Sequence, residues 1–302
     1  MTDGPGAVVV TGATGLLGRE LCRALADRGW EVRAWTRDVE AAAQLAGVSR
    51  AARCELPGDL DVSLLEGADA LVHAAWPTRT PDRETARCVG ERGTVSVLEA
   101  ARNAGIRRIL FVSSIAAAPE APQFYARSKA AAETLFDPER DLVVRLGLIL
   151  SREGEGIFRQ VQSAVKRLGV VPAFEGGTQP VQTIHIDDVC EGIARALDSD
   201  LTGRLQLAAP ESVTLADFAR LIADRLRTRV RLVPLPFGPV LWAVRALEAL
   251  HLPAPLSSES LMGVKALRTV ETRDDLGRLG LEVRSTPESV ADLLSGERQT
   301  FL

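Results

Sequence analysis

The sequence predicts an α/β fold in which a doubly wound parallel sheet is followed by a smaller C-terminal lobe. Two observations support this prediction. Short apolar runs alternate with segments of helical periodicity in the first half of the chain, and a glycine-rich turn follows the first apolar run. Strands separated by helices pair in parallel through right-handed crossovers. We place the first domain at residues 1–150 and the substrate-binding lobe at 151–302, with residues from about 181 to 200 returning to the sheet.

The first apolar run, Ala-Val-Val-Val from residue 7, has no polar alternation, as expected of a strand that is buried on both faces. Later runs are rich in β-branched residues, and helical segments between them end at glycines such as Gly29 and Gly105. Strands are therefore expected at 7–11, 30–36, 70–74, 108–113 and 142–150, and helices at 16–28, 94–103 and 126–136.

The alternation loosens after Ser151, where glycines and prolines interrupt the chain. Asp187 and Asp188 precede a helical pattern that runs to Leu197, and Thr214 is expected to cap a helix at 215–227. Three prolines lead into an apolar helix at 240–250, whose side chains we expect to line a pocket for a largely hydrophobic substrate; these are Leu241, Trp242, Leu247 and Leu250.

The turn after the first strand reads TGATGLLG and contains Gly12, Gly15 and Gly18. Glycine permits positive φ and removes the Cβ that would block a close approach of the backbone to a pyrophosphate. A helix that starts at this turn offers free N–H groups and a positive dipole end to phosphates. A strand, a glycine turn and a helix in this order predict a dinucleotide-binding site.

The end of the second strand is expected to contact the adenosine ribose. An acidic residue there binds the free 2′-hydroxyl of NAD, whereas an arginine accommodates the 2′-phosphate of NADP. Strand counting places Thr36 at the discriminating position, and Arg37 follows it. NADP(H) is therefore favoured over NAD(H), although Asp38 keeps NAD(H) as an alternative.

Tyr125 and Lys129 are four residues apart at the start of a predicted helix, so they can share one face. An ammonium beside a phenol, aided by an oxidised nicotinamide, favours the phenolate, which would lower the pKa of Tyr125 and suit it to acid–base catalysis. Tyr125 is the single tyrosine of the chain. Ser114 ends the strand just upstream, where its hydroxyl could bind a substrate oxygen.

Together these motifs resemble the extended, epimerase/dehydratase-like branch of the short-chain dehydrogenase/reductase superfamily, which implies a Rossmann-type fold. The matching segments are TGATGLLG, VHAA from Val72, VSS from Val112, YARSK from Tyr125, VVRLG from Val143, IHIDDV from Ile184 and DDLGRLGLE from Asp274. The resemblance implies a Ser114–Tyr125–Lys129 triad, an adenine site near Asp59 and Leu60, and a ribose contact from Lys129. The expected cofactor contacts are Gly12, Thr14, Gly15, Leu16, Leu17, Gly18, Thr36, Arg37, Asp59, Leu60, Ala74, Ala75 and Lys129.

The chain departs from this family where an Asn is common, because Gly90 stands at that position. It also carries no second tyrosine near Tyr125 and no Glu or Cys pair beside the motif. We therefore expect an oxidoreductase that interconverts a carbonyl and an alcohol on a small organic molecule. The alternatives are a nucleotide-sugar epimerase or dehydratase with tightly bound NAD(P), and a cofactor-binding scaffold that does not catalyse.

Composition and residue spacing argue against nucleic-acid binding, membrane insertion and metal binding. A net charge of −4 argues against nucleic-acid binding, and no apolar run approaches the ~18 residues of a membrane span. Four cysteines and three histidines are scattered without the spacing of metal ligands, so no metal site is expected. The N-terminus lacks a secretory signal pattern, and free thiols suit the cytoplasm, where we place the protein. The resemblance is compatible with a homodimer.

Overall fold

The computed structural model describes residues 5–77, 82–153, 157–250, 252 and 257–295. Its contacts divide the chain into two compact units. The first unit contains residues 1–146, 186–207 and 274–281, and the second contains 147–185, 208–273 and 282–302. The division by residues 1–150 and 151–302 remains a prediction about domains, and each unit is described by itself below.

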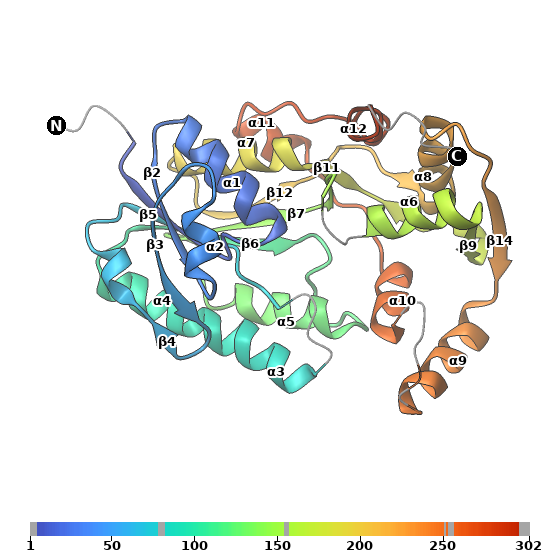
Figure 1. Cartoon of the computed structure of the whole chain (residues 1–302), viewed down its shortest axis with the longest axis horizontal. Coiled ribbons are helices and arrows are strands. Elements are labelled where there is room, and N and C mark those ends of the chain that lie inside the picture. Colours follow the sequence, from blue (N-terminus) through green and yellow to red (C-terminus); the bar gives the residue numbers. More distant parts are fainter. Residues whose placement is uncertain (1–4, 78–81, 154–156, 251, 253–256, 296–302) are drawn as a thin grey trace. The chain divides into compact units, whose positions relative to one another are not determined.

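The first unit is built on an eight-stranded sheet (Figure 1). Neighbouring strands are parallel throughout, except that the last strand is antiparallel to its partner. In spatial order the strands are β12 (Gly203–Leu207), β7 (Leu142–Leu146), β6 (Arg108–Ser114), β5 (Ala70–His73), β1 (Ala7–Thr11), β2 (Glu31–Thr36), β3 (Val48–Glu55) and β4 (Asp59–Leu60). The direction of winding reverses at β1, where open parallel sheets bind ligands at the carboxyl ends of their strands.

Helices cover both faces of this sheet (Figure 1). Helices α1 (Leu16–Asp27) and α7 (Ile186–Leu197) pack together on one face, and α4 (Gly93–Asn103) packs against β5 on the other. The remaining helical elements of the unit are α2 (Val39–Ala43), η1 (Val62–Leu65), α3 (Arg83–Arg87), the π-helical turn η2 (Cys88–Arg92), α5 (Phe124–Glu133) and α11 (Arg273–Arg278). Trp35 and Phe111 are fully buried in the core, where a large apolar side chain contributes about 1.5–3 kcal/mol.

Two strand predictions need correction. Residues 142–150 do not form one strand, because the chain leaves the large sheet at Gly147 and continues as β8 (Leu148–Leu150). A Cβ at Gly147 would lie 2.7 Å from the Ala208 Cβ, so the backbone passes where no side chain fits. Strands β3, β4 and β12 were not predicted, although in β12 Arg204 and Gln206 alternate with buried Leu205 and Leu207 in the pattern of a half-buried strand.

The second unit combines short strand pairs with helices. Strand β8 pairs in parallel with β11 (Thr183–His185), β9 (Val170–Phe174) pairs in parallel with β14 (Arg231–Leu235), and β10 (Pro180–Val181) pairs antiparallel with β13 (Val213–Thr214). Its helical elements are α6 (Ile157–Leu168), η3 (Glu175–Gly177), α8 (Leu215–Arg225), α9 (Phe237–Ala249), α10 (Ser258–Lys265) and α12 (Thr286–Leu293). The hydroxyl of Thr214 caps α8 by accepting the Asp217 N–H at 3.0 Å, as predicted.

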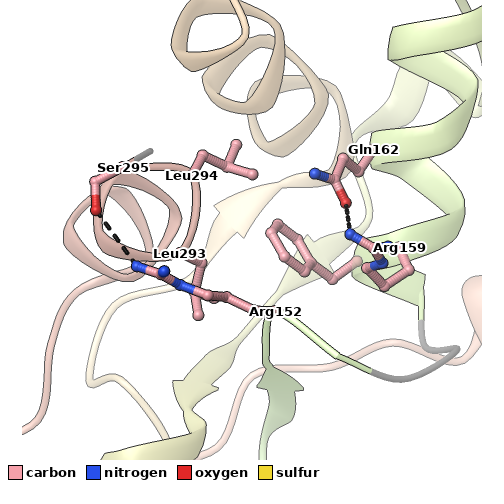
Figure 2. A pocket seen from close by; sticks show the side chains of 7 residues that line it. Arg152, Arg159, Gln162, Leu293, Leu294 and Ser295 are labelled. Atoms are coloured by element: carbon pink, nitrogen blue, oxygen red, sulfur yellow. Dashed lines mark hydrogen bonds between the residues drawn. The ribbon is translucent and has the colours of Figure 1, made fainter. Parts of the chain in front are cut away.

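A pocket of about 220 Å³ lies beside α6 and α12 in the second unit (Figure 2). Arg152 donates to the Ser295 hydroxyl at 3.4 Å and to the Asp292 carbonyl at 2.9 Å. Arg159 donates to the Gln162 side-chain oxygen at 2.7 Å. Both guanidinium groups are therefore bonded to residues of the pocket wall or its rim. Nothing in the sequence pattern indicated this pocket.

Helix α9 matches the predicted apolar helix but presents most of it to solvent. Trp242 is 75% exposed and Leu250 is 68% exposed, whereas Val244 is buried against a small cluster with Phe174 and Leu261. Leu241 and Leu247 are half-buried. None of the helices in the described part of the chain is both long and apolar enough to cross a bilayer.

Candidate active site

The glycine turn has the shape that the sequence predicted. Gly12 adopts φ +71°, and a Cβ there would lie 2.8 Å from the Ala75 backbone nitrogen. A Cβ at Gly18 would lie 2.2 Å from the Gly12 carbonyl oxygen, so helix α1 packs directly on the turn. Gly15 is the N-cap of α1, and in this described segment no side chain caps the helix and no acidic residue occupies its first turn. Thr14 precedes the cap, and Leu16 and Leu17 are the first two helical residues.

This arrangement fits a dinucleotide pyrophosphate. The backbone amides at the start of α1 are free of side-chain caps, and the missing Cβ atoms leave space that any larger residue would fill. The positive end of the helix dipole also favours a bound anion.

Thr11 ties the glycine turn to the end of β5. Its hydroxyl accepts the N–H groups of Ala74 and Ala75, each at 3.1 Å, and lies 2.8 Å from Nδ1 of His73. Ala74 and Ala75, two of the expected cofactor contacts, are therefore held against Gly12. The sequence analysis did not single out Thr11, because a threonine at a strand end has no distinctive signal without its partners.

The end of β2 brings together the residues predicted to read the ribose. Thr36 is buried, and its hydroxyl lies 3.3 Å from that of Thr14. Arg37 is exposed beside it. Asp38 is the N-cap of α2 and accepts the Ala41 N–H at 2.9 Å. The carboxylate that kept NAD(H) as an alternative is therefore engaged by its own helix.

Asp59 and Leu60, the residues expected near adenine, form β4 beside β3. Asp59 is exposed and pairs with Arg53 on β3, while Leu60 is half-buried against the apolar core. An open hollow of about 320 Å³ adjoins them, lined by Pro57, Gly58, Arg92, Val95 and Ser96. The structure thus places β4 next to a concave surface, without assigning its occupant.

Ser114 and Tyr125 meet at the carboxyl end of β6. Helix α5 begins at Phe124, two residues earlier than predicted, and Tyr125 lies in its first turn. The Ser114 hydroxyl lies close enough to the Tyr125 phenol to lower its pKa, and the Ser114 oxygen accepts the Ala116 N–H at 3.2 Å. The Tyr125 side chain is 36% exposed.

The pKa of Tyr125 corrects one expectation. Burial of the phenol raises this pKa above its usual value of 10.0, and the hydrogen bond with Ser114 lowers it by a smaller amount. The chain's own residues therefore favour the neutral phenol, not the phenolate that a neighbouring ammonium was expected to stabilise. The reason is that desolvation of the charged form outweighs the charge-stabilising contact.

Lys129 lies one turn further along α5 and is buried. Its Nζ donates to the Val112 carbonyl oxygen at 2.7 Å and lies 3.9 Å from the ring centroid of Trp76 and 4.5 Å from that of Phe111. Burial lowers the pKa of Lys129 well below its usual value, and the Glu133 carboxylate opposes this effect.

Glu133 anchors the far end of the same helix face. Its carboxylate accepts two hydrogen bonds from Arg145 on β7, at 2.8 and 2.6 Å, and one from the Ser113 hydroxyl at 2.6 Å. The Glu133 side chain is 4% exposed and that of Arg145 is 14% exposed. This ion pair joins α5 to two strands of the sheet. The sequence analysis missed it because the two partners lie on different elements, a helix and the next strand, which come together only in the fold.

His73 serves as a structural link in this unit. Its ring lies between the hydroxyls of Thr11 and Thr94, at 2.8 and 3.0 Å, and stacks on Phe111. Burial, together with the positive charge of Lys129, lowers the pKa of His73 to about 3. The imidazole is therefore neutral under ordinary conditions.

Comparison with known proteins identifies the family. A model of the NAD dependent epimerase/dehydratase family matches residues 8–205. The chain is 32% identical to a ceramide reductase of Caulobacter vibrioides over 267 residues, covering 82% of this chain and 79% of that protein. It is 31% identical to a 4-hydroxy-2-methyl-3-oxo-4-farnesyl-3,4-dihydroquinoline-1-oxide ketoreductase of Stigmatella aurantiaca, covering 94% of each chain.

Solved structures agree on the fold. The structure of MoeE5 with UDP-glucuronic acid and NAD superimposes with a TM-score of 0.75 at 18% identity, covering 96% of this chain and 98% of that one. At this identity the likeness shows the fold alone. The family match and the reductase relatives, added to a glycine turn shaped for a dinucleotide, show that the chain belongs to the NAD dependent epimerase/dehydratase family and is an NAD(P)-dependent oxidoreductase of the extended short-chain dehydrogenase/reductase type.

Proposed function

We propose that the protein is an NADP(H)-dependent reductase that interconverts a carbonyl and an alcohol on a small, largely hydrophobic organic molecule. The observation that carries this proposal is the placement of Ser114 at the carboxyl end of β6, with Tyr125 in the first turn of α5 and Lys129 one turn further along the same helix. The glycine turn after β1 lies at the same edge of the sheet, because these strands are parallel.

In this proposal Ser114 binds the substrate oxygen and Tyr125 supplies its proton. A bound NADPH supplies the hydride that the carbonyl carbon receives. As that carbon is reduced, negative charge develops on the oxygen, and the O–H bond of Tyr125 breaks to deliver a proton there. The raised pKa of Tyr125 suits this direction, since the phenol is protonated at neutral pH. In alcohol oxidation, the phenolate of Tyr125 takes the proton back.

Lys129 is proposed to hold the nicotinamide ribose and to stabilise the phenolate after proton transfer. Its place on α5, four residues after Tyr125, allows both groups to reach the same edge of the sheet. Its bond to the Val112 carbonyl limits the positions that Nζ can take.

The preference for NADP(H) rests on the end of β2. Thr36 offers no carboxylate, Arg37 is exposed and available to a 2′-phosphate, and Asp38 is committed to capping α2. Arg37→Ala is expected to weaken NADPH binding by about 10- to 100-fold and to leave NADH binding nearly unchanged. Calorimetric titration of both cofactors tests this, and an equal loss for both would refute the assignment.

The proposed substrate class draws on the relatives and on α9. One relative is named for ceramide and another for a farnesyl-bearing quinoline oxide. Helix α9 exposes Trp242 and Leu250, which could contact a hydrocarbon chain. We expect Trp242→Ala to raise KM for lipophilic ketones with little change in kcat, and an unchanged KM across such substrates would contradict this assignment.

The decisive experiment measures NADPH oxidation with a panel of carbonyl compounds, for the natural chain and for Tyr125→Phe. Loss of the proton donor should lower kcat by about 10²- to 10⁴-fold, with NADPH affinity retained. Activity that survives in Tyr125→Phe would contradict the role of Tyr125, and an absence of turnover with every substrate would favour a cofactor-binding scaffold. Tightly held NAD(H) after purification, without net cofactor turnover, would favour a nucleotide-sugar epimerase or dehydratase.

A further inference from the structure

Gly90, at a position where the family commonly has an Asn, lies against a tryptophan ring. A Cβ at Gly90 would stand 3.1 Å from both Cη2 and Cζ2 of Trp76. This is tighter than an ordinary van der Waals contact, so the indole takes up the space that a side chain at position 90 would need. Gly90 is buried, and it lies in the π-helical turn η2 between α3 and α4.

The same indole lies over the Lys129 side chain. Nζ is 3.9 Å from the centroid of the Trp76 ring, a distance typical of a cation–π interaction, and the Phe111 ring lies on another side at 4.5 Å. The Trp76 and Phe111 rings pack at 5.9 Å with a tilt of 57°. Lys129 is therefore held by one carbonyl, that of Val112, and by two aromatic rings.

We propose that Trp76 is a positioning residue for Lys129, whose indole face fixes and stabilises the ammonium, and that Gly90 provides the room for it. This inference deepens the proposed function, because Lys129 is part of the proposed machinery. The charged form of a buried lysine is costly, and a desolvated π face offsets part of that cost. The indole would do this without the hydrogen-bonding demand that an amide would bring into a buried site.

Other groups around Lys129 act on its charge as well. Glu133 on the same helix favours the ammonium, while His73 on β5 is neutral and Tyr125 on α5 is a neutral phenol. Arg145 neutralises much of the Glu133 charge through its paired hydrogen bonds. Within the described surroundings of Lys129, Trp76 is therefore one of few contributors that favour the charged form.

The chain is well suited to a direct test, because it contains three lysines in all, Lys129, Lys166 and Lys265. The full chain, labelled with [13Cε]lysine, would be titrated by NMR, with Lys166→Arg and Lys265→Arg used to assign the signals. Trp76→Leu should increase the acid dissociation constant of Lys129 by about tenfold or more, and Trp76→Phe by less, since phenyl is the weaker π face. Trp242→Phe, which changes an exposed tryptophan in the other unit, is the matched control and should leave the acid dissociation constant of Lys129 unaltered.

Gly90→Ala tests the second half of the proposal while the indole itself is kept. Its methyl group should displace the ring by a few tenths of an ångström and change the dissociation constant of Lys129 in the same direction, by less than Trp76→Leu does. If Trp76→Leu leaves the folded chain unstable, the Trp76→Phe and Gly90→Ala titrations decide the question. An unchanged or decreased dissociation constant in these variants would overturn the proposal.

A kinetic measurement then separates positioning from plain structural support. In Trp76→Phe, the pH profile for alcohol oxidation should move to higher pH, because a less charged Lys129 stabilises the phenolate less. If the natural chain shows no reductase activity, the proposed function is contradicted, and the NMR titration of Lys129 still tests the role of Trp76. If the Trp76→Phe variant has normal activity and an unaltered Lys129 titration, the role of Trp76 is refuted and the proposed function is not affected.

Discussion

The ion pair between Glu133 and Arg145 offers a sharp test of what holds α5, and with it Tyr125 and Lys129, on the sheet. The two side chains are 4% and 14% exposed and share two hydrogen bonds of 2.8 and 2.6 Å. Removing one partner of a buried pair leaves an uncompensated charge, which costs about 3–5 kcal/mol. Ser113 and Arg204, the latter at 3.5 Å, keep part of the Glu133 charge satisfied. We therefore expect Arg145→Met to cost about 3 kcal/mol of unfolding free energy, at the lower end of that range.

The variant that combines Arg145→Met with Glu133→Gln tests whether the two charges are coupled. Glu133→Gln should cost a similar amount, because Arg145 then loses its anion, whereas the two changes together leave no buried charge at this place. The combined loss should fall below the sum of the single losses by about 2 kcal/mol or more. Urea unfolding followed by tryptophan fluorescence in a Trp242→Phe background measures this, because the other three tryptophans belong to the first unit. Additive losses, within about 0.5 kcal/mol, would show that the pair is not coupled and would refute the reasoning.

Three further predictions follow from single residues. The pKa of His73 is about 3 in the folded chain and 6.5 in the unfolded chain. The neutral imidazole therefore contributes fully to stability above pH 6.5, and this contribution falls by about 1.4 kcal/mol per pH unit below it. His73→Leu should reduce the loss of stability at acid pH, measured by urea unfolding at several pH values, and an unchanged loss would contradict the buried, neutral imidazole. Gly18→Ala should lower the free energy of unfolding by about 1–3 kcal/mol and abolish NADPH binding, because its methyl group would meet the Gly12 carbonyl oxygen. A stable variant that still binds NADPH would disprove the packing of helix α1 on the turn. Cys88 is half-buried, whereas burial raises the pKa of the thiols of Cys22, Cys54 and Cys190 to about 12. A thiol reagent should therefore modify Cys88 first in the native protein. Fast reaction at a second cysteine would contradict the burial of the other three.

Local pattern predicted much of the first unit. Strands β1, β2, β5 and β6 and helices α1 and α4 were predicted to within one or two residues, because each has continuous apolar character or a clear glycine stop. Strands β3, β4 and β12 and the break at Gly147 were missed. Neighbours far away in the chain decide the last two, since β12 pairs with β7, and Gly147 is needed where the chain passes close to Ala208.

The candidate site shows the same division. Gly12, Gly18, Ser114, Tyr125 and Lys129 were predicted because turn chemistry and helical spacing are local properties. The roles of Thr11, Trp76, Glu133 and His73 were not predicted, because each depends on partners from another strand or helix. Spacing along a helix also says nothing about how much water the phenol loses, and in the chain alone burial raises the pKa of Tyr125.

The sequence by itself determined the family, the glycine turn and the Tyr–Lys pair, because these follow from short-range geometry and the side-chain chemistry of a few residues. Tertiary structure decided the burial that raises the pKa of Tyr125, the engagement of Asp38 as a helix cap and the aromatic surroundings of Lys129. The physical reason is that burial and long-range packing set the free energy of a charge, and both exist only once the chain has folded.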